Sequence, residues 1–413
     1  MTDLAGPSVS RDPAPSKTLL ILASTYPRWS GDPEPGFVHE LAKRLVDRFR
    51  VVVLCPHAKG AAHSELMDGV EVRRYRYAPS CWEALVNDGG IVSNLRNSLW
   101  KYALVPGFLL AQLWHAWRLH RTMSVDVVHA HWLIPQGVIA ALLPVPFVVT
   151  SHGADLYALR GRTLDAVKRF VLNRARSVTV VSSAMLDRLA TLGDFASRVS
   201  VLSMGVDVSG RFVVDGSVPR SKDEIIFVGR LVEKKGLRFL LQALPEIVRQ
   251  RPSTFLSFAG FGPDESMLRG MADKLGIADS VRFIGALPQA ALPAVYQRAA
   301  LFVAPFIRAD SGDQEGLPVA LMEALACGCP VVAGDVAGLY DLLGNNARNT
   351  LCDPRDKAEL VRRILTILDA PQKSREQAAI MSGSVKERFS WERISADYAD
   401  LLESAAMRGV SAN

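Results

Sequence analysis

The chain has 413 residues, enough for about two domains of ordinary size, each with its own core. Hydrophobic residues make up 49% of it and charged residues 22%, which is typical of a globular α/β protein and excludes overall disorder. The net charge of +6 is uneven, because residues 1–205 hold 23 Lys and Arg against 16 Asp and Glu, whereas the rest holds 25 against 26. The basic first half suits a membrane surface, an anionic acceptor, a nucleic acid or simply a solvated face.

The cysteines and the first residues bear on location. The five cysteines are odd in number and form no C-x-x-C pair, which indicates reduced thiols in a cytoplasmic protein with neither a disulfide framework nor a zinc ribbon. Residues 1–16 are rich in Ser, Pro and Asp and lack an apolar stretch, so they are expected to be a disordered tail and not a signal peptide. The apolar runs between residues 103 and 151 are interrupted by prolines, so none predicts a clean membrane-spanning helix.

An α/β alternation begins at residue 18. A continuous apolar strand over 18–24 is followed by a Pro- and Gly-rich loop ending at Gly36, a helix with Phe37, Leu41, Leu45 and Phe49 on one face, and a strand over 51–55. This β-α-β unit opens a parallel sheet. Gly36 leaves the backbone at the helix entry accessible to a ligand, although a plain turn glycine is the simpler reading. Further strands are predicted at the segments 127–132, 146–150, 178–182 and 199–203, giving a Rossmann-like domain over residues 17–205.

Residues 94–121 combine aromatic and basic side chains and predict a helical pair broken at Pro106 and Gly107. Tryptophans and cations mixed in this way favour shallow binding to an anionic membrane surface. The competing interpretation is that the tryptophans pack into the core. The residues that support the membrane interpretation are Trp100, Lys101, Trp114, Trp117, Arg118 and Arg121.

A short H-G-x-D sequence follows the strand at 146–150, with His152 and Asp155 as its polar members. The ends of strands in open parallel sheets are where ligands bind, so His152 is a candidate to hydrogen-bond a substrate hydroxyl. For an isolated histidine a structural role would be the better prediction. His129 and His131 are candidates of lower rank, as strand packing or lining of a cleft.

The second half restarts the alternation after a polar hinge at 219–223. An apolar strand over 225–228 leads into Gly229-Arg230-Leu-Val-Glu-Lys-Lys235-Gly and then an amphipathic helix. Two cations beside a helix N-terminus suit a diphosphate, although a solvated basic turn is the alternative. The next strand, 255–260, runs into a G-x-G loop containing Gly262, which lacks the third glycine of a dinucleotide fingerprint. We predict a second Rossmann-like domain over 206–385 and a final helix within 386–413.

The most informative stretch is 313–335, which reads D-Q-E-G-L-P-V-A-L-M-E-A-L-A-C-G-C-P-V-V-A-G-D. A helix is predicted with Pro318 in its first turn, and its periodicity lets Glu315 and Glu323 address one side of a cleft. The backbone amides of Gly316 and Leu317 at its start would then suit an anion. The stretch therefore predicts a site for a ligand that is both sugar-like and phosphorylated.

The E-x7-E pattern followed by Gly-Cys-Pro-Val-Val resembles the signature of the retaining, nucleotide-sugar-dependent glycosyltransferases of family four, also called glycosyl transferases group 1, which have the GT-B fold. G-R-L-x-x-x-K-G, H-G-x-D and the loop T-Y-P-R-W-S-G-D are similar to further sites of that family. The resemblance is strong over residues 224–335 and loose over 55–125. It implies two Rossmann-like domains around a cleft, with the acceptor mainly on the first and the nucleotide sugar mainly on the second, and a last helix that packs back on the first domain.

The resemblance also implies roles. Arg230 and Lys235 would bind the diphosphate, Glu315 the sugar hydroxyls and Glu323 the ribose, while His152 would lie near the reacting carbon. Four further residues would complete the donor site, namely Gly229, Gly262, Gly316 and Leu317, and two would belong to the acceptor side of the cleft, namely Gly36 and Asp155.

The expected reaction is transfer of a hexose-type sugar, with retention, to a glycan, a lipid-linked or a small-molecule acceptor, as in bacterial polysaccharide and glycoconjugate synthesis. The chain contains no D-x-D sequence, so no metal site is expected at the phosphates and no cofactor beyond the nucleotide sugar. The expected location is cytoplasmic, or peripheral on the cytoplasmic face of a membrane. The alternative is a noncatalytic basic protein that binds nucleotides or nucleic acid; it would account for the pI of about 9.1 but not for the E-x7-E pattern, so no nucleic-acid partner is expected.

Overall fold

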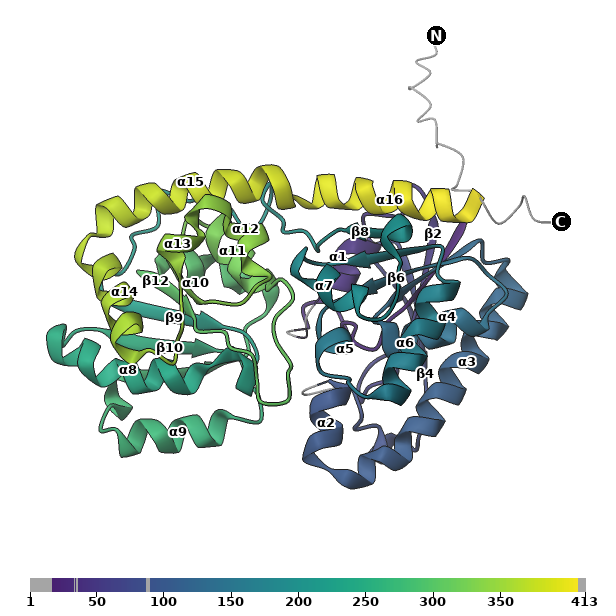
Figure 1. The fold of residues 1–413 in the computed structure, drawn as a ribbon, viewed down its shortest axis with the longest axis horizontal. Coiled ribbons are helices and arrows are strands. Elements are labelled where there is room, and N and C mark those ends of the chain that lie inside the picture. The colour runs from purple at the N-terminus through teal and green to yellow at the C-terminus, as the bar shows by residue number, and fades with distance from the viewer. Residues whose placement is uncertain (1–16, 33, 35, 87–89, 408–413) are drawn as a thin grey trace, which may run out of the picture.

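The computed structural model describes residues 17–32, 34, 36–86 and 90–407, and the predicted tail of residues 1–16 lies outside this part. The described residues form two α/β domains, each built on its own sheet (Figure 1). Helices cover both faces of each sheet, as parallel sheets require.

The sheet of the first domain has eight strands, and every neighbouring pair in it is parallel except β3 with β4. Across the sheet the order is β3 (Ser64–Met67), β4 (Val70–Tyr75), β2 (Arg50–Pro56), β1 (Thr18–Leu22), β5 (Val127–His131), β6 (Phe147–Ser151), β7 (Ser177–Val180) and β8 (Val199–Val201). Its helices are α1 (Phe37–Ala42), α2 (Ile91–Asn97), α3 (Leu104–Met123), α4 (Val138–Leu142), α5 (Ala154–Tyr157), α6 (Arg162–Arg174) and α7 (Ala184–Ala190).

The apolar residues of β1 explain why this sheet is buried on both sides. Leu20 and Leu22 point into one core, and Leu19 and Ile21 point into the core on the opposite face. Because side chains alternate along a strand, a continuous apolar run has to be covered twice. The strands predicted at 127–132 and 146–150 correspond to β5 and β6, which lie in the middle of the same sheet.

Three details of the first domain differ from expectation. The helix predicted to carry Phe37, Leu41, Leu45 and Phe49 ends at Ala42. The hairpin of β3 and β4 was not predicted, because its sequence alternates apolar with charged residues and lies where the family resemblance is loose. The break in the helical pair falls before Leu104, where a 3-10 segment, Leu99–Ala103, joins α2 to α3. Pro106 lies in the first turn of α3, where the missing N–H group costs little.

The second domain has a six-stranded, wholly parallel sheet. The order is β11 (Val281–Gly285), β10 (Phe255–Ala259), β9 (Glu224–Val228), β12 (Leu301–Ala304), β13 (Val331–Gly334) and β14 (Leu351–Cys352). The helices that pack on it and follow it are α8 (Leu237–Gln250), α9 (Glu265–Lys274), α10 (Leu292–Arg298), α11 (Val319–Ala326), α12 (Leu339–Leu343), α13 (Ala347–Thr350), α14 (Lys357–Asp369) and α15 (Pro371–Phe389).

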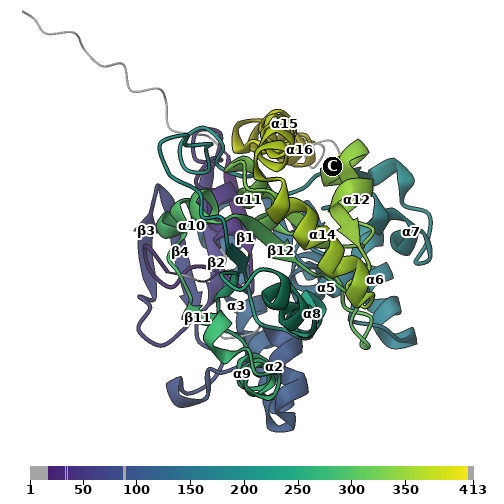
Figure 2. The ribbon, with the colours of Figure 1, turned by 90° about the vertical axis from the view of Figure 1, so that its left-hand side faces the viewer.

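The chain crosses between the domains twice, and the two crossings are hydrogen-bonded to each other. The amide of Val206 donates to the carbonyl of Phe389 at 2.8 Å, and the amide of Trp391 donates to the carbonyl of Val206 at 3.2 Å. After the second crossing, α16 (Trp391–Met407) runs over the first domain while α15 stays on the second, and both lie along the same edge of the molecule (Figures 1 and 2). Tyr398 and Leu402 of α16 are fully buried in the core that contains Leu19.

The tryptophans of the α2–α3 region are on the surface. The exposed fractions of Trp100, Trp114 and Trp117 are 51%, 53% and 48%, so the interpretation that they belong to the core is wrong. Within the described part of the chain, no helix is both long and apolar enough to cross a membrane.

Candidate functional site

A cavity of about 610 Å³ lies between the two domains, beyond the carboxyl ends of strands from both sheets. On the first domain it is bordered by the residues that follow β1, β5 and β6, and on the second by those that follow β9 and β12. Strand ends of open α/β sheets are the usual place for a ligand. Nine of the residues predicted for the site line this cavity, namely Gly36, His152, Asp155, Gly229, Arg230, Lys235, Glu315, Leu317 and Glu323.

Glu315 meets two lysines at the centre of the second-domain wall. Its Oε1 lies 3.2 Å from Nζ of Lys235 and 3.3 Å from Nζ of Lys234, and Lys234 also lies 3.4 Å from Asp313. Burial alone would raise the pKa of Glu315, but the two ammonium groups outweigh it and hold the pKa at about 2. The carboxylate is therefore ionised and can accept hydrogen bonds from hydroxyl groups.

The turn that carries the lysines is held against the loop that carries Glu315. The turn is a 3-10 segment, Glu233–Lys235, and the amide of Ile307 in the facing loop donates to the carbonyl of Lys234 at 2.9 Å. Gly236 ends the turn at φ +67°, and a Cβ there would lie 1.8 Å from the carbonyl oxygen of Pro305. No residue with a side chain fits this position, so the motif glycine serves the packing that brings Lys235 to Glu315.

Arg230 lies where the two domains approach each other. Its Nη1 would be 3.6 Å from a Cβ built on Gly90 of the first domain. With Lys235 and the N-terminus of α8 nearby, this corner of the cavity gathers positive charge from three sources. Such a corner suits a diphosphate.

Glu323 is buried, and both of its carboxylate oxygens have partners. Nε2 of Gln289 donates to Oε1 at 2.7 Å, and the hydroxyl of Tyr296 donates to Oε2 at 3.1 Å. Burial raises the pKa of Glu323 to about 7, although these hydrogen bonds and the charge of Arg211 oppose the rise. Glu315 and Glu323 thus line one cavity in opposite electrostatic settings.

The helix between the glutamates begins later than predicted. Pro318 is extended, at φ −78° and ψ 116°, and precedes the helix, so α11 starts at Val319 and Gly316 and Leu317 belong to the loop. A Cβ on Gly316 would lie 2.8 Å from the carbonyl oxygen of His152, which shows that this glycine permits close packing of the two domains. Leu317 packs against the cores of both domains. The proposed anion site on their amides stays a prediction.

Gly262 does not line the cavity. A Cβ at this position would lie 2.2 Å from the carbonyl oxygen of Leu231, so the glycine is required by the approach of two backbone segments. Gly36, by contrast, lines the cavity and has no atom within 3.4 Å of its Cβ position.

The H-G-x-D residues divide into a cavity-facing ring and a structural carboxyl group. His152 is half-buried and lines the cavity, and burial together with the neighbouring His129 lowers its pKa to about 3. Asp155 is buried and accepts hydrogen bonds from the amide of Leu133 at 2.6 Å and the hydroxyl of Ser151 at 2.8 Å. His152 is therefore neutral, and Asp155 ties the loop of His152 to the end of β5.

Sequence profiles and relatives decide the family. The family model described as "Glycosyl transferases group 1" matches residues 214–381, and the one described as "Glycosyltransferase Family 4" matches residues 37–209. A glycogen synthase from Mycobacterium tuberculosis is 30% identical over 301 residues, which is 70% of this chain and 71% of that protein. The chain belongs to the group 1 glycosyltransferases. A GDP-mannose-dependent α-(1-6)-phosphatidylinositol monomannoside mannosyltransferase from Mycolicibacterium smegmatis is 29% identical over 306 residues, covering 69% of this glycosyltransferase and 79% of that one.

Solved structures confirm the predicted GT-B fold of this glycosyltransferase. Sucrose-phosphate synthase from Thermosynechococcus elongatus superposes with a TM-score of 0.75 at 20% identity, covering 94% of this chain and 98% of the other. HepE from Anabaena, solved with UDP-glucose, superposes with a TM-score of 0.69 at 19% identity, covering 94% and 99%. The family prediction is confirmed as well, whereas the roles predicted for single residues stay predictions.

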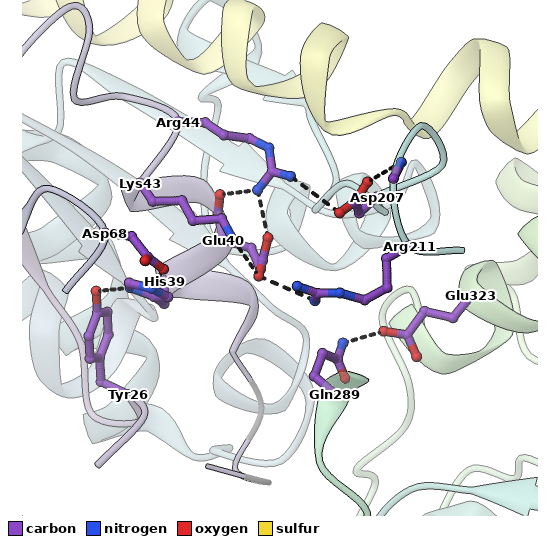
Figure 3. A network of polar contacts seen from close by, with 11 residues as sticks. Tyr26, His39, Glu40, Lys43, Arg44, Asp68, Asp207, Arg211, Gln289 and Glu323 are labelled. Carbon is purple, nitrogen blue, oxygen red and sulfur yellow. Dashed lines mark hydrogen bonds and ion pairs between the residues drawn. The ribbon is translucent and has the colours of Figure 1, made fainter. Parts of the chain in front are cut away.

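Sequence reasoning missed a polar network of the glycosyltransferase that joins the two domains beside Glu323 (Figure 3). Glu40 of α1 binds Lys43 at 2.9 Å and Arg44 at 2.6 Å, and it also lies 3.5 Å from Nη1 of Arg211, which follows the first domain crossing. Arg44 in turn lies 4.0 Å from Asp207 of the crossing. A glutamate on a short helix gives no sequence signal for this network, because the residues that extend it across the domains, Arg211 and Asp207, lie far from α1 in the chain.

Lys234 is the other residue that was missed, although it adjoins the predicted Lys235. The doublet was the available signal, since both side chains reach Glu315. Among the residues described by the structure, no group of three or more His, Cys, Asp or Glu side chains is placed to hold a metal ion.

Proposed function

We propose that this glycosyltransferase moves a hexosyl unit from a nucleoside-diphosphate sugar to a hydroxyl group of a glycan, a lipid-linked acceptor or a small molecule. The observation that carries the proposal is the meeting of Arg230, Lys235, Glu315 and Glu323 around one cavity between the domains. Cations suit a diphosphate, and carboxylates accept hydrogen bonds from sugar and ribose hydroxyls. The complex of the structurally similar HepE with UDP-glucose supports a donor of this class.

The arrangement matches the charges that develop in glycosyl transfer. Negative charge grows on the departing diphosphate, where Arg230 and Lys235 stabilise it, and positive charge grows at the anomeric carbon. The ionised Glu315 holds the sugar hydroxyls on the second-domain side, and the neutral His152 meets the sugar from the first domain. The cavity therefore separates the two developing charges.

Retention of configuration is part of the proposal. A double displacement would need a carboxylate free to attack the anomeric carbon. Glu315 is held by two ammonium groups and Asp155 by two hydrogen bonds, so neither is placed as a free nucleophile. For a reaction that retains configuration, as the family resemblance implies, this favours entry of the acceptor on the same face from which the diphosphate leaves over a double displacement.

We also propose that the reaction needs no metal ion. The charge of the diphosphate is met here by Arg230, Lys235 and the N-terminus of α8, and the sequence has no D-x-D to bridge a metal to phosphate. The reaction then needs no cofactor beyond the nucleotide sugar.

A ligand screen followed by a turnover assay tests the proposal. Nucleoside diphosphates and their sugars should raise the thermal midpoint of the purified protein, because a ligand of the folded state stabilises it by mass action. The best nucleotide sugar is then incubated with candidate acceptors, and proton NMR of the product reads the anomeric configuration. No midpoint shift with any uridine, guanosine or adenosine diphosphate sugar would count against the donor class, and an inverted product would count against retention.

We propose further that an anionic membrane presents the acceptor. Trp114 and Trp117 of α3 are exposed, and guanidinium groups lie over their rings, Arg118 at 5.5 Å and Arg121 at 5.3 Å from the ring centres. Interfacial aromatics beside cations are typical of shallow membrane binding. Ile91 and Val92 of α2, the helix that precedes α3 in the chain, line the cavity. The noncatalytic alternative is not favoured, since the relatives are glycosyltransferases.

A further inference from the structure

Three histidines lie together where β5 and β6 reach the cavity. His129 and His131 are fully buried on one face of β5, with their ring centres 4.2 Å apart, and His152 follows β6. His131 does not line the cavity, whereas His152 does. Any effect of His131 on a ligand must therefore pass through His152.

The plane of the His152 ring is set by its aromatic neighbours. The ring centres of Phe37 and Trp132 each lie 5.0 Å from that of His152. The ring of His131 is nearly parallel to it, at 11° and 5.2 Å. Packing against three rings orients the imidazole, but it does not decide which of the two ring nitrogens carries the proton.

One hydrogen bond can decide that. Nδ1 of His131 lies 3.0 Å from Nε2 of His152, and because burial lowers the pKa of both rings, both are neutral and one nitrogen donates to the other. If His152 donates, His131 must carry its proton on Nε2. If His131 donates, its Nε2 is a bare lone pair and His152 must carry its proton on Nδ1.

The surroundings of His131 favour the second arrangement. Nε2 of His131 is buried and has no hydrogen-bond partner among the described residues. An unpaired N–H group buried away from water is rarer and more costly than a bare acceptor in the same place. If His131 donates from Nδ1 instead, its Nε2 carries no proton, and no unpaired N–H group is buried there.

We propose that His131 is a positioning residue, which donates from Nδ1 to Nε2 of His152 and so makes His152 present its Nδ1–H group to the cavity. The inference rests on the proposed function for the identity of the ligand, a hydroxyl oxygen of the donor sugar. In this form His152 donates a hydrogen bond and is not available as a proton-accepting base. As an uncharged donor it holds the sugar without opposing the positive charge that grows at the anomeric carbon.

The tautomer can be read without any turnover. The protein is labelled with ¹⁵N-histidine, and long-range ¹H–¹⁵N correlation of the ligand-free enzyme separates protonated from bare ring nitrogens; the spectrum of a His152→Asn variant assigns the signals. We expect His152 with a protonated Nδ1 and a bare Nε2. A protonated Nε2 on His152 overturns the proposal.

Two isosteric variants test the role of His131. The amide nitrogen of Asn reaches about the place of Nδ1, and that of Gln about the place of Nε2, so His131→Asn keeps the donor and His131→Gln removes it. We expect kcat/KM with the nucleotide sugar to stay within about threefold for His131→Asn and to fall about tenfold or more for His131→Gln, the effect of one lost hydrogen bond. His129→Gln is the matched control, since it retains the bond from Nε2 to Oγ1 of Thr150 and should leave the His152 signals unchanged.

The outcomes separate this inference from the proposed function. Equal kcat/KM and unchanged His152 signals in His131→Gln overturn the positioning role. Equal losses in His131→Asn and His131→Gln, with the wild-type tautomer of His152 in both, also overturn it, because they indicate a merely structural residue. The expected tautomer in a protein that turns over no nucleotide sugar overturns the proposed function and supports the assignment of the proton.

Discussion

The residues predicted to bind the donor differ in charge between the two sides of the cavity. On the second domain, Glu315 is ionised and lies between two ammonium groups, and Arg230 adds a third cation. On the first domain, His152 is neutral, and the carboxyl group of Asp155 is buried in hydrogen bonds. Fixed cations suit the leaving diphosphate, whereas a neutral ring such as that of His152 suits the sugar. The ion-paired carboxylates of Asp32 and Glu40 also line the first-domain side of the cavity.

The largest expected effect lies in the second-domain wall. Arg230→Ala and Lys235→Ala should each lower turnover by on the order of a hundredfold or more, because each removes a cation that stabilises the departing diphosphate. Steady-state kinetics with the best nucleotide sugar measures this, and circular dichroism checks the fold. Lys274→Ala removes an exposed cation of the same domain and should have no effect. Near-normal turnover in both test variants would remove the diphosphate assignment.

The next effect concerns the exposed surface of the α2–α3 region in the first domain. Changing Lys101, Arg118 and Arg121 together to Gln should weaken binding to anionic vesicles by on the order of a hundredfold, since each cation near the surface contributes about 1 kcal/mol. Vesicle sedimentation at two salt concentrations measures the effect, and turnover of a water-soluble acceptor should be unchanged. Equal pelleting with neutral and anionic vesicles would contradict the membrane proposal.

Glu323 gives the second-domain wall a pH dependence. Its carboxyl group faces Tyr296, Gln289, Arg211 and, more distantly, Glu40, and its pKa is raised to about 7. An ionised carboxylate binds a ribose diol best, so affinity for the nucleoside diphosphate should rise about tenfold from about pH 6 to about pH 8. Isothermal titration of wild type and Glu323→Gln with the same ligand isolates this term. An equal pH dependence in both proteins would show that Glu323 does not contribute.

The same pKa makes a statement about stability. Because it lies above the unfolded value of 4.5, the protonated carboxyl favours the folded state, and this contribution is lost as the pH rises from about 4.5 to about 7. In the absence of ligand, Glu323→Gln should therefore flatten the fall of the thermal midpoint over this range.

The last prediction is that removing metal ions leaves turnover unchanged. Turnover should persist in EDTA, because the second-domain wall meets the diphosphate with side-chain cations. A loss of activity that magnesium restores would show that the second-domain wall is incomplete without a metal ion.

Local and long-range contacts differ in how well the sequence predicts them. Arg230 and Lys235 belong to one short motif after a strand, so their neighbourhood in the fold follows from local structure. Glu40 and Arg211 lie 171 residues apart, and only the packing of the domains brings them together. Periodicity could not place the start of α11 either, since the extended Pro318 and the preceding loop are held by tertiary contacts.

Glycines show a second limit. Sequence reasoning assigned Gly262 and Gly316 to ligand binding, yet both sit where another backbone carbonyl comes within 3 Å of the Cβ position. In a single sequence, a glycine that leaves room for a ligand cannot be told from one that leaves room for another backbone segment of the same chain. The sequence also left undecided whether the tryptophans of the α2–α3 region are buried or exposed, because an apolar residue between cations can face the core or the solvent.

The return of α16 to the first domain has a consequence for the order of events during synthesis. A domain usually folds once its own residues have left the ribosome. Here Tyr398 and Leu402 complete the core beside Leu19, so the domain built on β1 lacks part of its interior until α16 has been synthesised. The second domain, whose core is built from residues between Val206 and Phe389, can be complete before that point. Of the two domains, the one translated earlier therefore needs the later-translated residues to complete its core.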